Sequence, residues 1–357
     1  NRIIIDDVLL DDQSGKEMLK ITRLSAKFDI IPLFNGKITI SSVQLFGFNI
    51  NLNKPAPHME PNFKFVLDAF ASKDTVKTKK DIDLRINSIL IRRGKLSYDV
   101  LSEEETPGKF NPQHIKLHNI IANISLKALQ NDSVNAAIKR LSVDEQSGFE
   151  LRKLSLKVIA NNKGMKIENF AIEMPGTEMK MDTIRMEYDS LKALNHFADN
   201  VRFSFRTLPS HVTLNDISAF VPALSNFKEK LDLNIDVEGT LNQLNCRTLE
   251  INAGDKFRLK GDVSLQDLSR PQDAYVYGHL ANLSANKEGI GFLVRNLSPH
   301  YNGVPPVLQH LGNTSFHGEI SGYFTDLVMY GLFRTDIGSV QTDLKLSSDK
   351  AKALFSY

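Results

Sequence analysis

The 357-residue sequence contains a single cysteine, Cys246, and no tryptophan. One cysteine excludes an intramolecular disulfide framework and a cysteine-rich metal site. The missing tryptophan, together with the lack of an evident aromatic platform, disfavours a carbohydrate-binding sandwich. No run reaches the roughly 18 apolar residues of a membrane-spanning helix, and no secretory signal peptide is recognisable.

Neither sign of charge predominates, because 44 lysine and arginine residues are balanced by 42 aspartate and glutamate residues. Domains that bind nucleic acid usually carry a basic surplus, so no nucleic-acid partner is expected. No linker rich in proline, glycine or serine divides the chain. Asn1 already lies in a strand pattern and Tyr357 closely follows another, so we expect a piece of a longer protein.

Signatures of catalysis are also missing. The sequence has no glycine-rich nucleotide motif, no P-loop and no Gly-x-Ser-x-Gly elbow. His114 and His118 are four residues apart but lack the accompanying glutamate of a zinc-binding helix, and we expect both at the surface. His310 and His317 have no acidic ligand spaced to join them, which favours a structural role. The sequence therefore predicts neither an enzyme nor a metal or cofactor site.

What the sequence does contain is a repeated phrase of two alternating apolar positions, a polar pair and two more alternating apolar positions. Such alternation is typical of a β-strand with one dry face. The eight copies have their apolar positions at Ile3/Ile5/Val8/Leu10, Leu19/Ile21/Leu24/Ala26, Ile38/Ile40/Val43/Leu45, Leu84/Ile86/Ile89/Ile91, Ile115/Leu117/Ile120/Ala122, Phe149/Leu151/Leu154/Leu156, Met165/Ile167/Phe170/Ile172 and Met179/Met181/Ile184/Met186.

The polar pair shifts the phase of the alternation, which in a flat strand would turn half of the apolar side chains toward water. A tight hairpin would need glycine or a similar residue with positive φ, and none of the eight pairs contains glycine. We therefore favour a β-bulge, which absorbs one residue and bends the strand. Repeated bulges predict a mainly β fold: a long, curved antiparallel sheet folded over its own apolar face into an open groove.

Three short helices are expected between the strands. They lie near residues 61–71, where Pro61 suits a first turn, near 214–227, and near 305–311, with Gly312 at a C-cap position. Each is too short to be stable alone in water, so each needs an apolar surface. A soft boundary near residues 190–212 divides the expected sheet into segments 1–200 and 201–357.

Two passages resemble the AsmA/TamB-like family. The first is Ile30–Ile40 followed by Val43–Leu52, which contain a Pro-Leu step, a Gly-Lys step and a later glycine between apolar alternations. The second is Phe316–Gly322 with Gly331–Val340, which are similar to the glycine-punctuated strands of TamB-like members. The strand phrase itself extends the resemblance over most of the chain.

This resemblance implies a periplasmic protein anchored to the inner membrane by an N-terminal helix that precedes the given sequence. It implies a repeating β-groove (a β-taco fold) related to bridge-like lipid-transfer proteins. Family members are associated with moving phospholipid toward the outer membrane or with outer-membrane assembly, in which an outer-membrane barrel protein is a possible partner. The family supplies no catalytic residues to transfer.

Two functions remain open: a groove that binds phospholipid acyl chains, and a structural or assembly protein that docks partners through exposed edge strands. An ordinary closed core is the third interpretation of the same apolar pattern. The groove hypothesis predicts a strand lining formed by Ile21, Leu24, Phe28, Ile40, Val43, Leu45, Leu84, Ile86, Ile89, Ile91, Leu117, Ile120, Leu151, Leu154, Leu156, Ile167, Phe170, Ile172, Met181, Ile184 and Met186. The helices are expected to add Phe63, Val66, Leu67, Phe70, Ile217, Phe220 and Leu224.

Overall fold

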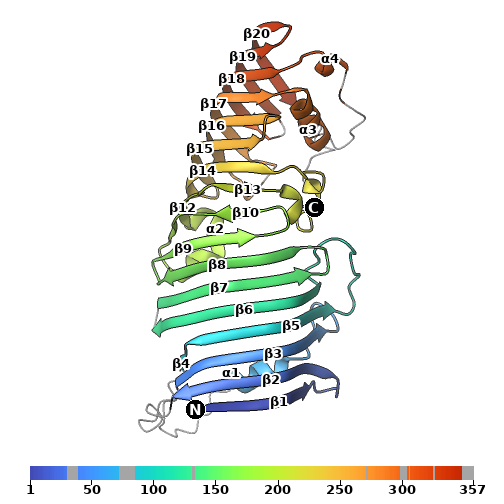
Figure 1. Cartoon of the computed structure of the whole chain (residues 1–357), viewed down its shortest axis with the longest axis vertical. Helices are drawn as coiled ribbons and strands as arrows, with labels where there is room; N and C mark the ends of the chain where they lie inside the picture. The colour runs from blue at the N-terminus through green and yellow to red at the C-terminus, as the bar shows by residue number, and fades with distance from the viewer. Residues whose placement is uncertain are drawn as a thin grey trace. The chain divides into compact units, whose positions relative to one another are not determined.

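The computed structural model describes residues 1–29, 39–71, 85–130, 133–270, 272–297, 304, 306–324 and 326–347. The chain forms two compact units, unit 1 (Asn1–Lys157) and unit 2 (Val158–Tyr357). This division falls earlier in the chain than the expected boundary near residue 200. Both units are mainly β, as the alternation predicts (Figure 1). No helix in the described part is both long enough and apolar enough to cross a membrane.

Unit 1 is a sheet of long strands. These are β1 (Arg2–Asp11), β2 (Glu17–Asp29), β3 (Thr39–Lys54), β5 (Ser88–Val100), β6 (His114–Gln130) and β7 (Ser133–Glu145), with the two-residue strand β4 (Arg85–Ile86) before β5. The next strand, β8 (Glu150–Ala160), begins in unit 1, and its last three residues belong to unit 2. The pairs β1–β2, β2–β3, β5–β6 and β6–β7 are antiparallel, as expected. The exception is β3, which pairs in parallel with β4 and β5. A parallel pair needs a crossover, and helix α1 (Lys64–Ala71) lies in this connection.

Unit 2 contains shorter strands, and all of its ladders described here are antiparallel. From β14 onward each strand pairs with the next in sequence (Figure 1). The strands are β9 (Gly164–Glu173), β10 (Glu178–Lys180), β11 (Ile184–Glu187), β12 (Arg202–Arg206), β13 (Ser210–Val212), β14 (Leu231–Thr240), β15 (Gln243–Ala253), β16 (Phe257–Gln266), β17 (Tyr275–Ala285), β18 (Thr314–Tyr323), β19 (Asp326–Thr335) and β20 (Gly338–Ser347).

Short helices occur in all three expected places. The first is α1. The second is a pair of 3₁₀ turns, η3 (Leu214–Ile217) and η4 (Pro222–Leu224), of which η4 begins at the proline. The third is α4 (Pro306–Gln309). The sequence interpretation missed α3 (Lys287–Leu297). Where η2 (Leu191–His196) and α2 (Phe197–Asn200) lie, it predicted a soft boundary and no helix.

Backbone bends occur at the polar pairs of the strand phrase. Asp7, Asn119 and Asn169, each the second residue of its pair, have φ of 55°, 55° and 54°. Aspartate and asparagine tolerate this left-handed conformation better than most residues. At Ser41-Ser42 the β2–β3 register shifts by one residue, which is the expected bulge.

Elsewhere the strand breaks instead of bulging. Asn87 separates β4 from β5, and the pair Asp182-Thr183 separates β10 from β11. A bulge and a break in the strand have the same effect on the side chains. The phase of the alternation is reset, so the apolar residues before and after the polar pair can share a face.

Replacing Asn119 with valine should destabilise the fold more than replacing it with glycine. Both variants lose the 2.6 Å hydrogen bond from Asn119 Nδ2 to Asp144 Oδ2, so their difference reports on the backbone. A β-branched residue with positive φ is strained. We therefore expect the free energy of unfolding of Asn119→Val to be about 1–2 kcal/mol lower than that of Asn119→Gly. Urea denaturation measures this difference. Asn123 lies in the same strand but outside the bend, and there the Asn123→Val protein should be at least as stable as the Asn123→Gly protein.

Candidate apolar ligand-binding site

Apolar residues opposed in neighbouring strands of unit 1 form rows across the sheet. Side chains that face one another across a ladder share one face. We call the face carrying these rows the apolar face of unit 1. Two rows lie on one side of the bends, Ile5–Leu24–Leu45–Ile91–Ala122–Leu141 and Ile3–Ala26–Val43–Ile89–Ile124–Ile138, and a third lies on the other side, Leu10–Leu19–Ile50–Leu96–Leu117.

At the bend, Phe48 covers a glycine of the next strand. A Cβ atom on Gly94 would lie 2.3 Å from two carbons of the Phe48 ring and 3.1 Å from Ile120 Cβ. Only a glycine therefore lets this ring lie flat against the sheet. Phe48 is opposed to Ile21 on its other side, and both are buried. The apolar face is thus continuous through the bend.

The predicted lining residues are mostly half-buried. Among those whose side chains are described, Ile21, Leu151 and Ile184 are buried, whereas Leu67 and Phe220 are exposed. Leu84 and the side chain of Phe70 lie outside the described residues. The remaining residues of the prediction are intermediate in burial. In the closed core of a domain the same positions would be expected to be fully buried.

Several predicted residues are also brought together in unit 2. Ile167 opposes Ile184, and Met165 opposes Met186. Tyr188, Ala193 and Val201 cover Met165 and Met186 in a small buried cluster, so these methionines serve as core. Ile172 opposes Met179 in the β9–β10 ladder.

The most extensive apolar rows of unit 2 were not part of the prediction. They cross all strands from β14 to β20 and lie on either side of the register shifts in these ladders. The rows are Leu233–Ile251–Leu259–Leu283–Phe316–Phe333–Val340 and Val237–Cys246–Val263–Gly278–Ile320–Met329–Leu344. We call the face that carries them the apolar face of unit 2.

Helix α3 covers part of this face. Ile290 and Phe292 of the helix are buried against Leu231, Ala253 and Phe257 of the strands. Phe227, from the segment after η4, meets Phe292 edge-on with 5.9 Å between the ring centroids. Figure 1 shows α3 beside the β14–β20 ladder.

A pocket of about 380 Å³ lies where α3 stops covering the strands. Pockets for small ligands have volumes of about 300–1,000 Å³. The pocket wall consists of apolar side chains and two threonines: Leu283, Ala285, Ile290, Leu293, Val294, Thr314, Phe316, Met329, Phe333, Val340, Thr342 and Leu344. None of these residues is titratable, so the pocket can bind apolar groups but offers no acid or base.

Burial decreases along the rows away from α3. Phe316 in β18 is 3% exposed, whereas Val340 and Leu344 in β20 are 54% and 45% exposed. In the described part of unit 2, the apolar face therefore runs from a core covered by α3 to exposed apolar side chains on β20. Large apolar areas left open in this way usually mark a binding surface.

The sequence does carry a signal for α3. Asn286 caps the helix by accepting a hydrogen bond from the Gly289 N–H at 2.9 Å, and Ile290, Leu293, Val294 and Leu297 follow at helical spacing. Gly289 and Gly291 have low helix propensity, which obscures this helical pattern in the sequence. Gly289 is required by packing, because a Cβ there would lie 1.9 Å from the carbonyl oxygen of Lys256.

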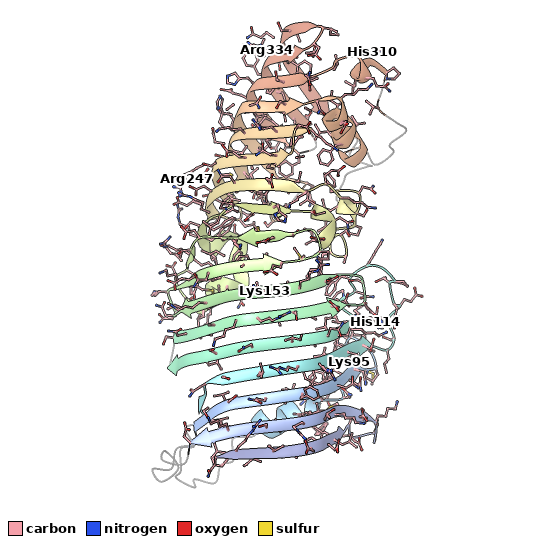
Figure 2. All side chains as sticks on the ribbon, in the orientation of Figure 1. Lys95, His114, Lys153, Arg247, His310 and Arg334 are labelled. Carbon is pink, nitrogen blue, oxygen red and sulfur yellow. The ribbon has the colours of Figure 1, made fainter. Side chains whose placement is uncertain are left out.

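Charged side chains occupy the opposite, solvent-facing side of the strands in unit 2. The Asp236 carboxylate accepts hydrogen bonds from Arg247 at 3.0 Å and Arg206 at 3.3 Å, and Glu238 pairs with Arg202 at 2.5 Å. Burial alone would raise the pKa of Asp236, but the two arginines outweigh it and keep the pKa below its usual value. Figure 2 shows Arg247 at the margin of the strands. Exposed pairs of this kind add little stability, but they keep this face polar.

His114 departs from the sequence prediction, because it is buried and only His118 is exposed. The ring nitrogens of His114 lie 2.9 Å from Asp99 Oδ1 and 2.9 Å from the Glu103 carbonyl oxygen. Both partners can accept hydrogen bonds, so this arrangement favours the protonated imidazole, in which both nitrogens donate. The bond to Asp99 raises the pKa of His114, against the opposing effect of burial.

Asp99, Glu105 and His114 present ligand atoms within 4.8 Å of one another, yet these groups already satisfy each other. Glu105 pairs with Lys116 at 2.8 Å, and both nitrogens of His114 are engaged. The cluster fastens the loop before β6 to the ends of β5 and β6. Figure 2 shows His114 at these strand ends. The buried position was missed because the fold brings Asp99, at the end of β5, and the Glu103 carbonyl, in the loop after β5, to His114.

Comparison with protein-family models, curated proteins and solved structures found no significant match to this chain.

The glycines of α3 allow a matched test of how this helix is seated. We expect Gly289→Ala to lower the free energy of unfolding by about 1–3 kcal/mol, because the added methyl group collides with backbone. Gly291→Ala should be neutral or stabilising by up to about 1 kcal/mol, since its Cβ would meet only Val304 at 3.6 Å. Chemical denaturation of both variants measures the contrast. Equal effects at the two positions would contradict the described seating of α3.

Proposed function

We propose that this chain is a non-enzymatic lipid-binding protein whose apolar faces hold acyl chains. The observation that carries the proposal is the apolar pocket beside α3, together with the exposed continuation of its rows onto β20. A lipid chain seated there would cover side chains that the fold leaves open. Its headgroup would remain in water, in agreement with the small number of polar groups in the pocket wall.

The energetics favour such a ligand. An acyl chain of about sixteen methylenes at about 0.8 kcal/mol each gains roughly 13 kcal/mol when fully buried. An open face recovers part of this amount. Successive positions along the rows offer similar apolar contacts, so a bound chain could slide along them without losing all of its contacts at once.

The resemblance to AsmA/TamB-like proteins makes the proposal more specific. In that setting the chain would be a periplasmic segment that carries phospholipid between the inner and outer membranes, and an inner-membrane helix outside the given sequence would anchor the protein. The repeated strand phrase and the open apolar faces agree with this role.

A second function is favoured by the edge strands. Among the described ladders, β1 pairs only with β2 and β20 only with β19. Ile3, Ile5 and Leu9 of β1 are about half exposed. Unpaired edges of this kind can accept a strand from another protein. In this alternative the chain is an assembly protein that docks outer-membrane partners by β-augmentation.

Met329 and Tyr330 provide a matched pair for testing the lipid proposal. They are consecutive in β19 and so point to opposite faces: Met329 lines the pocket, and Tyr330 is 55% exposed. We expect Met329→Asp to weaken binding of the fluorescent fatty acid cis-parinaric acid at least tenfold, because an ionised carboxylate in the pocket would lack a partner. Tyr330→Asp should bind like the unchanged protein.

Binding is compared at matched folded fraction, judged by circular dichroism. Unchanged affinity in a folded Met329→Asp protein would refute the pocket as a lipid site. If neither variant nor the unchanged protein binds the probe, the edge-strand function becomes the better account.

A further inference from the structure

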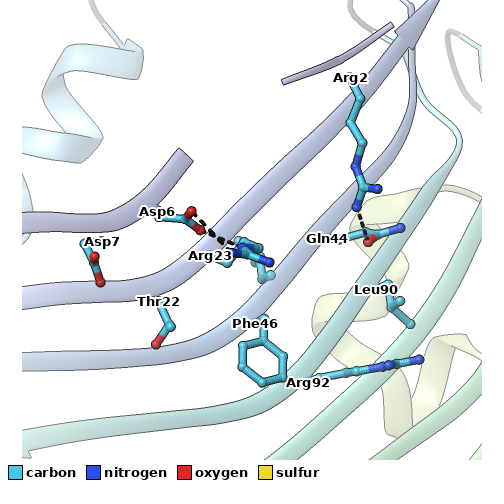
Figure 3. A pocket seen from close by; sticks show the side chains of 10 residues that line it. Arg2, Asp6, Asp7, Thr22, Arg23, Gln44, Phe46, Leu90 and Arg92 are labelled. Carbon is cyan, nitrogen blue, oxygen red and sulfur yellow. Dashed lines mark hydrogen bonds and ion pairs between the residues drawn. The ribbon is translucent and has the colours of Figure 1, made fainter. Parts of the chain in front are cut away.

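A second pocket lies in unit 1, mainly on the face of the sheet opposite to its apolar rows. Its volume is about 790 Å³, and Figure 3 shows its walls. It spans β1, β2, β3 and β5 on the face that carries polar side chains. Gln44 and Phe46 face it, and along β3 they alternate with Val43 and Leu45 of the apolar rows. Leu45 and the carboxylates of Asp6 and Asp7 also border the pocket.

Two ladder pairs of β3 and β5 form the floor. Gln44 opposes Leu90, and Phe46 opposes Arg92. The Phe46 ring is partly exposed, and the Arg93 guanidinium lies 5.4 Å from its centroid. The floor therefore combines an aromatic ring and a leucine with a cationic border.

The arginines around the floor differ in how their charge is compensated. Arg23 is neutralised by Asp6, with Nε 2.6 Å from Oδ1. Among the described residues, Arg2 is held only by neutral acceptors, Ser25 Oγ at 2.7 Å and Gln44 Oε1 at 3.2 Å. Its guanidinium is thus fixed in place while its charge stays uncompensated.

Arg92 has no hydrogen-bond or ion-pair partner within the part of the chain that the structure describes. It borders Phe46, whereas the Arg2 guanidinium reaches Gln44, and these two positions of β3 are about 7 Å apart on one face. Two uncompensated guanidinium groups therefore flank one patch of floor (Figure 3). Guanidinium forks match the geometry of phosphate oxygens and bind them through paired N–H donors.

We infer that this pocket binds a phosphate ester, with the phosphate between Arg2 and Arg92 and the organic part of the ester on Phe46 and Leu90. The inference is independent of the proposed acyl-chain site, since it concerns the other face of the sheet and the other unit. A soluble phosphate ester and a phospholipid headgroup present the same chemistry to these residues.

The test uses two probes. Binding of glycerol 3-phosphate is measured by titration calorimetry, and binding to phosphatidylcholine vesicles is compared with and without phosphatidylglycerol. We expect the chain to bind at least one phosphate probe and Arg92→Gln to weaken that binding about tenfold, the loss of one charge-assisted contact. Arg92→Lys keeps the positive charge without the forked guanidinium, so it should retain part of the affinity that Arg92→Gln loses. Higher salt should weaken binding in the unchanged protein.

Arg140→Gln is the matched control, because Arg140 is exposed on the same row as Gln44 and Leu90 but two strands beyond β5. It should leave binding unchanged. Binding of glycerol 3-phosphate supports a soluble ester as ligand, and binding of phosphatidylglycerol vesicles alone supports a headgroup. Equal weakening by Arg92→Gln and Arg140→Gln, no effect of Arg92→Gln, or no binding of either probe would overturn the inference. Melting temperatures confirm that all variants fold.

Discussion

The structure depends on placing the apolar side chains of both halves of a bent strand on one face. A straight strand with the observed sequence would send half of these side chains into water. The bends at Asp7, Asn119 and Asn169, with φ near 55°, prevent this at the cost of an unfavourable backbone conformation. Burying the cross-strand rows offsets this cost, because each Å² of buried apolar surface contributes roughly 25 cal/mol of free energy. Each bend is therefore stabilised by the rows that it aligns.

These rows are buried only in part, which distinguishes the fold from a sandwich. In unit 2, α3 covers one portion of the apolar face, and the pocket begins where this cover ends. A second sheet packed on the same face would have buried Val340 and Leu344 as it buries the core of a sandwich. The same chain keeps its other face wet with ion pairs such as Asp236–Arg247. One face is thus suited to apolar ligands and the other to water and charged groups.

The sequence alone predicted the strands, the bends and the three short helical places, because each depends on local pattern. It did not predict the parallel pairing of β3 with β5, since alternation specifies a face but not a neighbour. Helix α3 was missed because Gly289 is required by contact with Lys256, which is distant in sequence. The buried state of His114 depends on acceptors from two other segments. The pocket proposed to bind phosphate assembles side chains from several strands, and no linear motif connects Arg2 with Arg92.

The strand lining predicted from the sequence and the pocket beside α3 share no residue, although both consist of apolar side chains aligned on one face of a sheet. Pattern reasoning concentrated on the eight phrases, which end at Met186. The most extensive rows lie beyond residue 230, where longer alternations with interspersed glycines replace the phrase. Gly318 and Gly331 oppose each other there, and a Cβ on either would meet backbone. Glycines that permit such close approach weaken the apolar periodicity and so conceal the rows.

The central claim is that the apolar faces hold lipid chains, and native mass spectrometry of the purified protein with extraction of co-purifying lipids tests it most directly. The account predicts protein ions that carry added masses of phospholipid, and an extract that contains the same species. A protein that carries no lipid, and acquires none when incubated with phospholipid vesicles, would contradict the account.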